Sequence, residues 1–272
     1  MPDSGSAAEA AADLAHQWRL QPDGATRAGS QSVVMPVHTS DGVAAVLKVA
    51  TTEGYSPHEH LVLRRWGGNG AARLLRADPH RRAVLVERLG TQDLTGLPDL
   101  QACEVVAALY RRLHVPAMPQ LPSVTAGLES PALTALPRGA AIPHRLVEQA
   151  ISLGRDLTAA PAAEVVLHGD LTYRNVLAAQ REPWLAISPR PCNGDPHYEL
   201  AAMLWHRWDE LSGHIRGGLR YRLATLVEAA GLDEDRARAW VLVRVVHAAA
   251  REVGADPVRL TRYVAIAKAV QD

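Results

Sequence analysis

The stretch that decides the fold is Val165-Val166-Leu167-His168-Gly169-Asp170-Leu171-Thr172-Tyr173-Arg174-Asn175-Val176-Leu177. Apolar, β-prone residues stand at both ends and enclose a short polar loop. On a tight loop between strands, Asp170 and Asn175 are expected to point into one site. A carboxylate there can accept the proton of a substrate hydroxyl, and an amide oxygen suits Mg²⁺, which prefers hard oxygen ligands. A plain His-Gly-Asp turn is the alternative interpretation.

Lys48 is the second candidate, because it lies inside an apolar, β-prone run at 43–49. A buried ammonium needs an anionic partner, and Glu59 on the next predicted helix can supply it. Such a strand lysine, held by a helix glutamate, orients nucleotide phosphates in phosphoryl transfer. A lysine that extends from a strand edge into solvent is the alternative. Only Lys48 and Lys268 are lysines among 29 basic residues, which favours a specific role for Lys48.

A weaker phosphate-binding signal lies just before the first predicted strand of that region. Residues 28–32 read Ala-Gly-Ser-Gln-Ser, and Ser30 with its neighbours could approach phosphates through backbone N–H groups. The segment has one glycine, so an ordinary turn explains it equally well.

Composition excludes several classes of function. The 272 residues carry 29 basic and 29 acidic side chains, so a broad basic face and a nucleic-acid partner are disfavoured. No apolar run reaches about 18 residues, so no membrane span is expected. The N-terminal residues lack a secretory pattern, and Cys103 and Cys192 lack metal-ligand spacing. We expect a cytoplasmic protein with reduced thiols.

The pattern along the chain predicts an α+β fold with a small β-rich N-terminal lobe at 1–89 and a larger helical lobe at 90–272. In the first lobe the predicted helices are 6–18 and 57–66, the latter with Pro57 in its first turn, and the predicted strands are 33–37, 43–47, 72–75 and 83–89. In the second lobe the predicted helices are 98–114, 143–158, 197–212, 215–230, 233–253 and 257–270. An extended loop is expected at 115–141, and short strands and turns at 165–188.

Several blocks together resemble the aminoglycoside phosphotransferases, and more closely the branch that contains streptomycin 6-kinases and hydroxyurea phosphotransferases. The matching blocks are 46–49, 58–68, 70–75, 85–89, 168–177, 184–187, 194–201 and 204–211. The resemblance spans roughly residues 27–212.

This resemblance implies a protein-kinase-like two-lobed fold with ATP bound between the lobes. Lys48 would hold the α- and β-phosphates, and Glu59 would hold Lys48. The segment 86–89 would be the hinge that meets adenine, which makes Glu87 and Leu89 nucleotide-binding candidates. Asp170 would be the catalytic base and Asn175 a ligand of Mg²⁺.

One departure from the family pattern concerns the metal. Members carry an Asp directly after the apolar strand at the position of Ser188, where that Asp bridges Mg²⁺ to the phosphates. A serine offers a neutral oxygen on a shorter arm, so Ser188 would be a weak metal ligand. Two explanations remain open. The chain is a pseudokinase with a binding or regulatory role, or Asp195 or Glu199 replaces the missing ligand, although Asp195 also suits a helix cap.

The expected activity is ATP-dependent transfer of a phosphoryl group to a hydroxyl of a small molecule, of the antibiotic-resistance type. A cationic aminoglycoside acceptor would need carboxylates, for which Asp209, Glu210 and Glu252 are the candidates. Each of them can equally belong to a solvated face. The acceptor can instead be a small neutral alcohol or a hydroxyurea-like compound.

Overall fold

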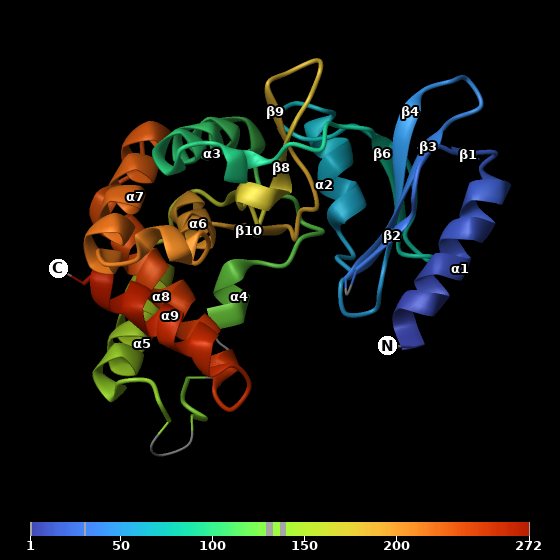
Figure 1. The fold of residues 1–272 in the computed structure, drawn as a ribbon. Helices are drawn as coiled ribbons and strands as arrows, with labels where there is room; N and C mark the ends of the chain where they lie inside the picture. The colour runs from blue at the N-terminus through green and yellow to red at the C-terminus, as the bar shows by residue number, and fades with distance from the viewer. Residues whose placement is uncertain (1, 30, 129–132, 137–139, 272) are drawn as a thin grey trace. The chain divides into compact units, whose positions relative to one another are not determined.

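The computed structural model describes residues 2–29, 31–128, 133–136 and 140–271 (Figure 1). The chain divides into two compact units. Unit 1 comprises Met1–Gln92 and Leu177–Pro191, and unit 2 comprises Asp93–Val176 and Cys192–Asp272. The sequence-based division at 89/90 differs from these units in two respects: the first segment of unit 1 ends at Gln92, and the segment 177–191 groups with the β-rich unit.

Unit 1 is built on an antiparallel sheet with the strand order β1-β3-β4-β6-β5, and β2 also pairs with β3. The strands are β1 Gln21–Pro22, β2 Arg27–Ala28, β3 Ser32–His38, β4 Ala44–Ala50, β5 Leu74–Asp78 and β6 Ala83–Glu87. Alternate residues of β3 are buried, as expected for a strand with one face on the core. Helix α1, Pro2–Gln17, covers this face, where Leu14 packs with Val33 and Leu47 (Figure 1).

The second helix of unit 1, α2, spans Glu59–Trp66. It is capped at its C-terminus by Gly67, whose φ of 58° is left-handed. Pro57 precedes this helix instead of lying in its first turn, so that expectation was wrong. The predicted strand at 72–75 is displaced to 74–78, and the one at 83–89 ends at Glu87.

The segment 177–191 joins unit 1 through backbone hydrogen bonds between residues far apart in sequence. Its hairpin consists of β8 Val176–Ala178 and β9 Trp184–Ala186. The Ala72 N–H donates to the Ala186 carbonyl at 2.9 Å, and the Gly90 N–H donates to the Ala178 carbonyl at 2.8 Å. These bonds attach the hairpin to the residues just before β5 and just after β6.

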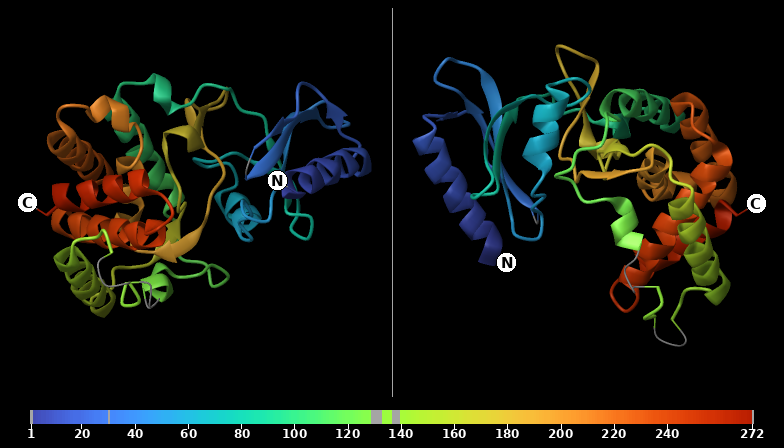
Figure 2. Two further views of the ribbon diagram at one scale, coloured as in Figure 1. Left: turned by 60° about the horizontal axis from the view of Figure 1, so that its bottom comes forward. Right: turned by 180° about the vertical axis from the view of Figure 1, so that it is seen from behind.

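Unit 2 is mainly helical, and its long helix α8 packs against α5 and α9 (Figure 2). Its helices are α3 Asp99–Leu113, α4 Val124–Leu128, α5 His144–Ala159, α6 Ala201–Leu204, α7 Ile215–Ala230, α8 Glu234–Glu252 and α9 Pro257–Ala269. Four 3-10 turns are η1 Leu94–Gly96, η2 Tyr173–Asn175, η3 Pro196–Leu200 and η4 Trp208–Leu211. Strands β7 Val165–Leu167 and β10 Cys192–Gly194 form an antiparallel pair.

Two expectations for unit 2 were wrong. The predicted loop at 115–141 contains α4, and Ser123 forms an isolated bridge with Asn193. The predicted helix at 197–212 is instead η3, α6 and η4, interrupted where Arg207 adopts a left-handed φ of 52°. Elsewhere, α3, α5, α7, α8 and α9 agree with the predicted helices to within two residues at each end.

Two further observations concern the whole described chain. Within the ranges that the structure describes, no helix combines the length and apolar character needed to cross a membrane. Cys103 and Cys192 are both free thiols.

Candidate active site

Lys48 and Glu59 form a close ion pair in unit 1. Strand β4 carries Lys48 between the neighbouring strands β3 and β6, and Glu59 is the first residue of α2. The Lys48 Nζ atom lies 2.8 Å from Oε1 and 3.0 Å from Oε2 of Glu59. The two side chains are 17% and 9% exposed, so the pair is largely removed from solvent.

The pair opens into a cavity of about 470 Å³ that residues of unit 1 alone line. Its walls are mainly apolar, and include Val46, Val86, Leu177 and Ile187. This volume lies within the range of ligand pockets for small molecules. An apolar slot with an ammonium group at its edge suits a ligand that joins a flat aromatic ring to an anionic group.

Glu87 and Leu89 also line this cavity, but the Glu87 carboxylate is already engaged. Its Oε1 accepts from Arg181 Nη2 at 2.6 Å and from the Arg73 backbone N–H at 2.7 Å. Burial raises the pKa of Glu87, but the Arg181 hydrogen bond and the Arg73 N–H outweigh it and leave the pKa below its ordinary value. The Glu87 backbone N–H is engaged as well, because it donates to the Arg73 carbonyl at 3.0 Å. Nothing in the local sequence singled out Arg181.

Ser188 follows β9 and also lines the cavity. Its φ of 55° places it in the left-handed region, which non-glycine residues seldom occupy. The Lys48 Nζ atom lies 3.3 Å from its Oγ atom, so the hydroxyl is a second partner of the ammonium. Ser30, the other phosphate-binding candidate, lies outside the described residues.

In unit 2, Asp170 and Asn175 are brought together on the loop after β7. The Asn175 side-chain amide donates to the Asp170 carbonyl at 2.6 Å and to its Oδ2 atom at 3.3 Å. The Asp170 backbone N–H donates to Nδ1 of the buried His168 at 3.3 Å, so this histidine holds the loop backbone. Asn175 thus holds Asp170 with the amide nitrogen.

A second pair of residues clamps the same loop at Gly169, whose φ is 79°. Glu199 Oε1 accepts from the Gly169 N–H at 2.7 Å, and Arg244 Nη2 donates to the Gly169 carbonyl at 2.7 Å. Glu199 is fully buried, and burial raises its pKa to about 7 despite the nearby Arg244. The sequence reasoning missed Arg244, although a lone arginine in the apolar run 241–246 is a usable signal.

Residues 17–255 match the family described as aminoglycoside/hydroxyurea antibiotic resistance kinase. The chain belongs to this family. It is 37% identical over 249 residues to a streptomycin 6-kinase of Streptomyces griseus, covering 85% of this chain and 78% of that relative. It is 36% identical over 271 residues to a hydroxyurea phosphotransferase of Kitasatospora aureofaciens, covering 94% and 76%.

A solved structure shows the same fold. A thermostable variant of aminoglycoside phosphotransferase APH(4)-Ia, in complex with AMP-PNP and hygromycin B, matches with a TM-score of 0.63 at 16% identity. The match covers 95% of this chain and 97% of that one. The predicted protein-kinase-like α+β fold is thus confirmed. Family membership also confirms the predicted class of activity, which is phosphoryl transfer to a small molecule. The pseudokinase alternative is not favoured.

Both carboxylates that line the unit 1 cavity are already paired with cations. Mg²⁺ is usually bound through one or two carboxylates together with substrate phosphates. Of the cavity's carboxylates, Glu59 is paired with Lys48 and Glu87 with Arg181. No group of three or more His, Cys, Asp or Glu side chains within the described ranges could hold a metal ion. At the position of the family's aspartate, Ser188 presents a neutral hydroxyl that lies 3.3 Å from Lys48 Nζ.

Asp195 is also unsuited to replace that ligand, since four donors surround its buried carboxylate. Oδ1 accepts from the backbone and the ring of His197, and Oδ2 accepts from Arg236 and from Trp240 at 2.7 Å. Although burial opposes it, these hydrogen bonds hold the pKa of Asp195 well below its ordinary value. The bond to the His197 N–H confirms the expected helix cap. Glu199 is buried against Gly169 and holds the loop instead.

The three acceptor-binding candidates are mostly occupied by arginines. Glu210 accepts from Arg207 Nε at 2.6 Å, and Glu252 lies 3.1 Å from Arg259 Nη1. Asp209 is exposed. A cationic acceptor would therefore meet two carboxylates whose charge is already compensated.

Proposed function

We propose that this chain transfers the γ-phosphoryl group of ATP to a hydroxyl of a small molecule, with the nucleotide held in the unit 1 cavity. The observation that carries this proposal is the Lys48–Glu59 pair at an apolar cavity. Adenine would lie between the apolar walls. The Leu89 N–H, which has no hydrogen-bond partner in the described part of the chain, would donate to it. Lys48 would bind the phosphates, and Glu59 would fix its ammonium group.

In unit 2, Asp170 would act on the acceptor. The acceptor oxygen bonds to the γ-phosphorus, the bond from that phosphorus to the β,γ-bridging oxygen breaks, and ADP leaves. The hydroxyl proton passes to the Asp170 carboxylate. Asn175, Glu199 and Arg244 would hold the loop in position for this transfer. Leu177, which lines the nucleotide cavity, stands two residues after Asn175 in the chain.

The proposal assigns 1–89, together with 177–191, to nucleotide binding, and the remaining part of 90–272 to catalysis and acceptor binding. Mg²⁺, when it accompanies ATP, would neutralise phosphate charge. Lys48, which lines the cavity together with Arg27 and Arg88, would supply cationic charge beside the phosphates. We therefore expect this chain to depend on Mg²⁺ less strongly than a relative that carries aspartate at the position of Ser188.

The test is ATP turnover with streptomycin, hydroxyurea and a panel of hydroxylated compounds. We expect acceptor-dependent ADP formation that Asp170→Asn lowers at least 100-fold while ATP affinity is retained. Asp156→Asn, an exposed change of the same chemistry on α5, serves as the matched control and should leave turnover unchanged. Nucleotide binding without transfer to any acceptor would overturn the proposal and favour a pseudokinase.

A further inference from the structure

The residues of the sheet that line the unit 1 cavity form rows that run across the strands. Arg27 of β2 stands opposite Val34 of β3, and Val34 stands opposite Lys48 of β4. Residues that face each other in an antiparallel pair point to the same side of the sheet, and all three line the cavity. Neighbouring strands are spaced so that two steps across the sheet separate the Cα atoms of Arg27 and Lys48 by about 10 Å.

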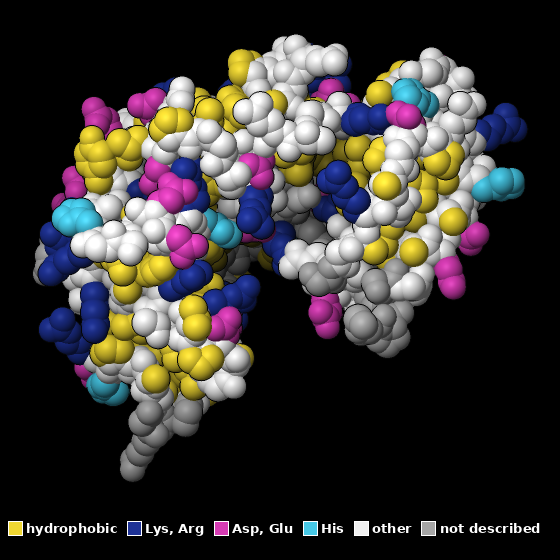
Figure 3. Space-filling view, in the orientation of Figure 1, with side chains coloured by type: hydrophobic (Ala, Val, Ile, Leu, Met, Phe, Trp, Pro, Cys, Tyr) yellow, Lys and Arg dark blue, Asp and Glu magenta, His cyan; other side chains and the backbone are white. Residues whose placement is uncertain are grey.

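A second row on the same side of the sheet is apolar. Pro36 stands opposite Val46, and Val46 stands opposite Val86 of β6. These three residues also line the cavity. On the face of unit 1 seen in Figure 3, basic side chains (dark blue) border apolar surface over the strands. A flat ring suits the apolar row, and the anionic part of the same ligand would then lie beside the row that contains Arg27 and Lys48.

The described residues that line the cavity include five charged ones, and four of these are already paired within unit 1. The pairs are Lys48 with Glu59, Glu87 with Arg181, and Arg88 with Asp23. The fifth charged residue, Arg27, is exposed, and its guanidinium forms no hydrogen bond or ion pair with the residues that the structure describes. The cavity therefore presents one uncompensated positive charge, which attracts an anionic ligand.

The turn that follows Arg27 is fixed by the contacts of Gln31. The Gln31 carbonyl accepts from the Thr51 N–H, directly after β4, at 2.9 Å. A Cβ atom at Gly54 would lie 1.9 Å from the same carbonyl oxygen, so this close approach requires a glycine. The Gln31 side chain also accepts from Arg190 Nη2 at 2.8 Å. The edge of the sheet that carries Arg27 is therefore held in place, while the exposed guanidinium can turn toward a ligand.

We propose that Arg27 binds the phosphate groups of the nucleotide, so that Lys48 and Arg27 hold them from two strands of one sheet. This inference rests on the proposed function and adds a residue to its nucleotide site. A guanidinium presents a planar fork of donors that matches phosphate oxygens, and the long side chain of arginine covers the distance across the strands. Because Ser188 brings no carboxylate for Mg²⁺, a second protein cation also compensates phosphate charge that a tightly held metal would otherwise neutralise.

A different contact could use the same side chain. A guanidinium can stack on the adenine ring instead of reaching the phosphates. The position of Arg27 in the row of Lys48, and not in the apolar row, favours the phosphates. The two contacts differ in one measurable respect, because only a contact with phosphate depends on the phosphates that the ligand carries.

The test is calorimetric titration of the whole chain with adenosine, ADP and ATP. Mg²⁺ is left out, so that it does not mask the phosphate charge. Arg27→Gln should lower the affinity for ADP and ATP at least 10-fold and the affinity for adenosine less than 2-fold. Arg65→Gln, an exposed change of equal charge on α2, is the control and should leave all three affinities unchanged. Circular dichroism and thermal unfolding confirm that each variant is folded.

Two results would overturn the inference. An equal loss of affinity for adenosine and ATP in Arg27→Gln would show that the guanidinium stacks on the ring. No loss for any of the three ligands, or the same loss in Arg65→Gln, would show that Arg27 is an ordinary solvated residue.

Turnover separates this inference from the proposed function. In an active protein, Arg27→Gln should raise the KM for ATP at least 5-fold and leave the KM for the acceptor within 2-fold. If the natural chain phosphorylates an acceptor and Arg27→Gln binds ATP as tightly as the natural chain does, the inference fails and the proposed function stands. If ATP binds through Arg27 and no acceptor is phosphorylated, the proposed function fails and the phosphate contact stands.

Discussion

The Nζ atom of Lys48 lies 3.3 Å from the Oγ atom of Ser188, while both carboxylate oxygens of Glu59 lie within 3.0 Å of the same ammonium. Lys48 therefore has one anionic and one neutral partner. A carboxylate in place of Ser188 would compete with Glu59 for the ammonium and would add the hard oxygen that Mg²⁺ prefers. The charge at this one position thus decides how phosphate charge is balanced in the cavity.

Ser188→Asp should make nucleotide binding depend on Mg²⁺. We expect Mg²⁺ to change the ATP affinity of the natural chain by less than about 3-fold and that of the variant by at least 10-fold. Aspartate is among the residues that tolerate a left-handed backbone, so the φ of 55° should be retained. Calorimetric titration of ATP with and without Mg²⁺ measures the difference.

Ser188→Asn is the matched control, because it has the same shape without the charge. It should resemble the natural chain. Strong tightening of ATP by Mg²⁺ in the natural chain would contradict the prediction and would show that another ligand completes the metal site.

Two replacements of Lys48 should show whether ATP affinity depends on its positive charge alone or also on the compact shape of its ammonium group. Lys48→Ala should lower ATP affinity at least 10-fold, and Lys48→Arg should restore little of it, because a planar guanidinium cannot take the place of a compact ammonium between Glu59 and Ser188. Lys48→Ala also leaves the Glu59 carboxylate buried and unpaired, at a cost on the order of 1–3 kcal/mol in unfolding free energy.

The double variant Lys48→Ala with Glu59→Gln distinguishes these two effects. It should recover most of the stability and none of the ATP affinity. Denaturant unfolding and nucleotide titration on the same samples provide both readouts. Recovery of ATP affinity in the double variant would show that Lys48 serves the fold alone.

Glu199 should give the folding stability a dependence on pH between about 4.5 and 7. Burial raises its pKa from 4.5 to about 7 in the folded chain, so the folded state binds more protons than the unfolded state in that interval. The stabilisation is fully present below about pH 4.5 and is lost as the pH rises through about 7. Its size is on the order of 3 kcal/mol, since one pKa unit corresponds to about 1.4 kcal/mol.

Glu199→Gln keeps the oxygen that accepts from the Gly169 N–H and removes the ionisation. From pH 4.5 to 7.5 the unfolding free energy of this variant should rise relative to that of the natural chain, because histidines of lowered pKa, such as His114 and His206, contribute equally to both proteins. Glu104→Gln, an exposed carboxylate change on α3, should leave the slope unaltered. Equal slopes in all three proteins would show that Glu199 remains ionised throughout.

The predicted bounds of an element match the observed ones best where the residue pattern of that segment alone determines how it packs. Helix α5 was expected at 143–158 and is observed at 144–159, because its apolar residues repeat with the helical period. The close approach of Lys48 to Glu59 was also foreseeable, since a lysine in an apolar strand needs an anion nearby. These features depend on short segments of chain.

Features that depend on distant segments could not be read from the sequence. The hydrogen bonds that attach 177–191 to unit 1 join residues about ninety or more positions apart. The Glu87–Arg181 pair, which removes the Glu87 carboxylate from the candidate ligands, is of the same kind. Neither leaves a periodic signal in the sequence.

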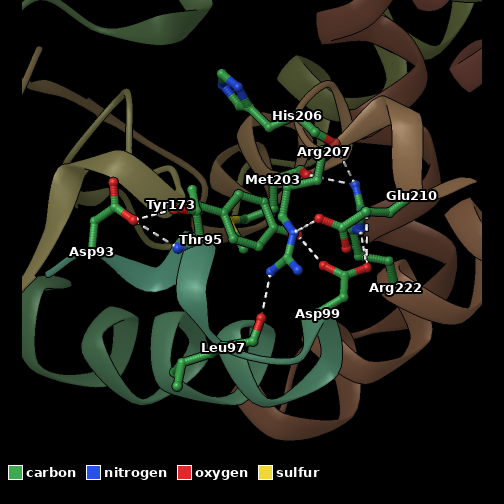
Figure 4. A network of polar contacts seen from close by, with 10 residues as sticks. All are labelled: Asp93, Thr95, Leu97, Asp99, Tyr173, Met203, His206, Arg207, Glu210 and Arg222. Atoms are coloured by element: carbon green, nitrogen blue, oxygen red, sulfur yellow. Dashed lines mark hydrogen bonds and ion pairs between the residues drawn. The ribbon is translucent and has the colours of Figure 1, made fainter.

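The interruption of the predicted helix at 197–212 also depends on a residue that is distant in sequence. The polar contacts of Arg222 show this (Figure 4). The fully buried Arg222 donates to the carbonyls of Met203 and His206 at 3.2 and 2.9 Å, and pairs with Asp99 at 2.8 Å. A helix would use these carbonyls for its own hydrogen bonds. Arg222, which lies on α7, thus replaces local bonds with long-range ones, and this exchange allows the turn at Arg207.

Arg222→Met should therefore both destabilise the fold and loosen this segment. The change leaves Asp99 and the two carbonyls without their donor, at a cost of about 3–5 kcal/mol in unfolding free energy. Hydrogen exchange of residues 205–212 should accelerate at least 10-fold relative to α5. Arg216→Met, an exposed change on the same helix, should cost less than about 0.5 kcal/mol. Adding Asp99→Leu should restore part of the stability, because the stranded charge is removed, but it should leave the exchange of 205–212 fast. If Arg222→Met left the exchange unchanged, the interruption at Arg207 would be fixed by its contacts to Leu97 and Tyr173 instead.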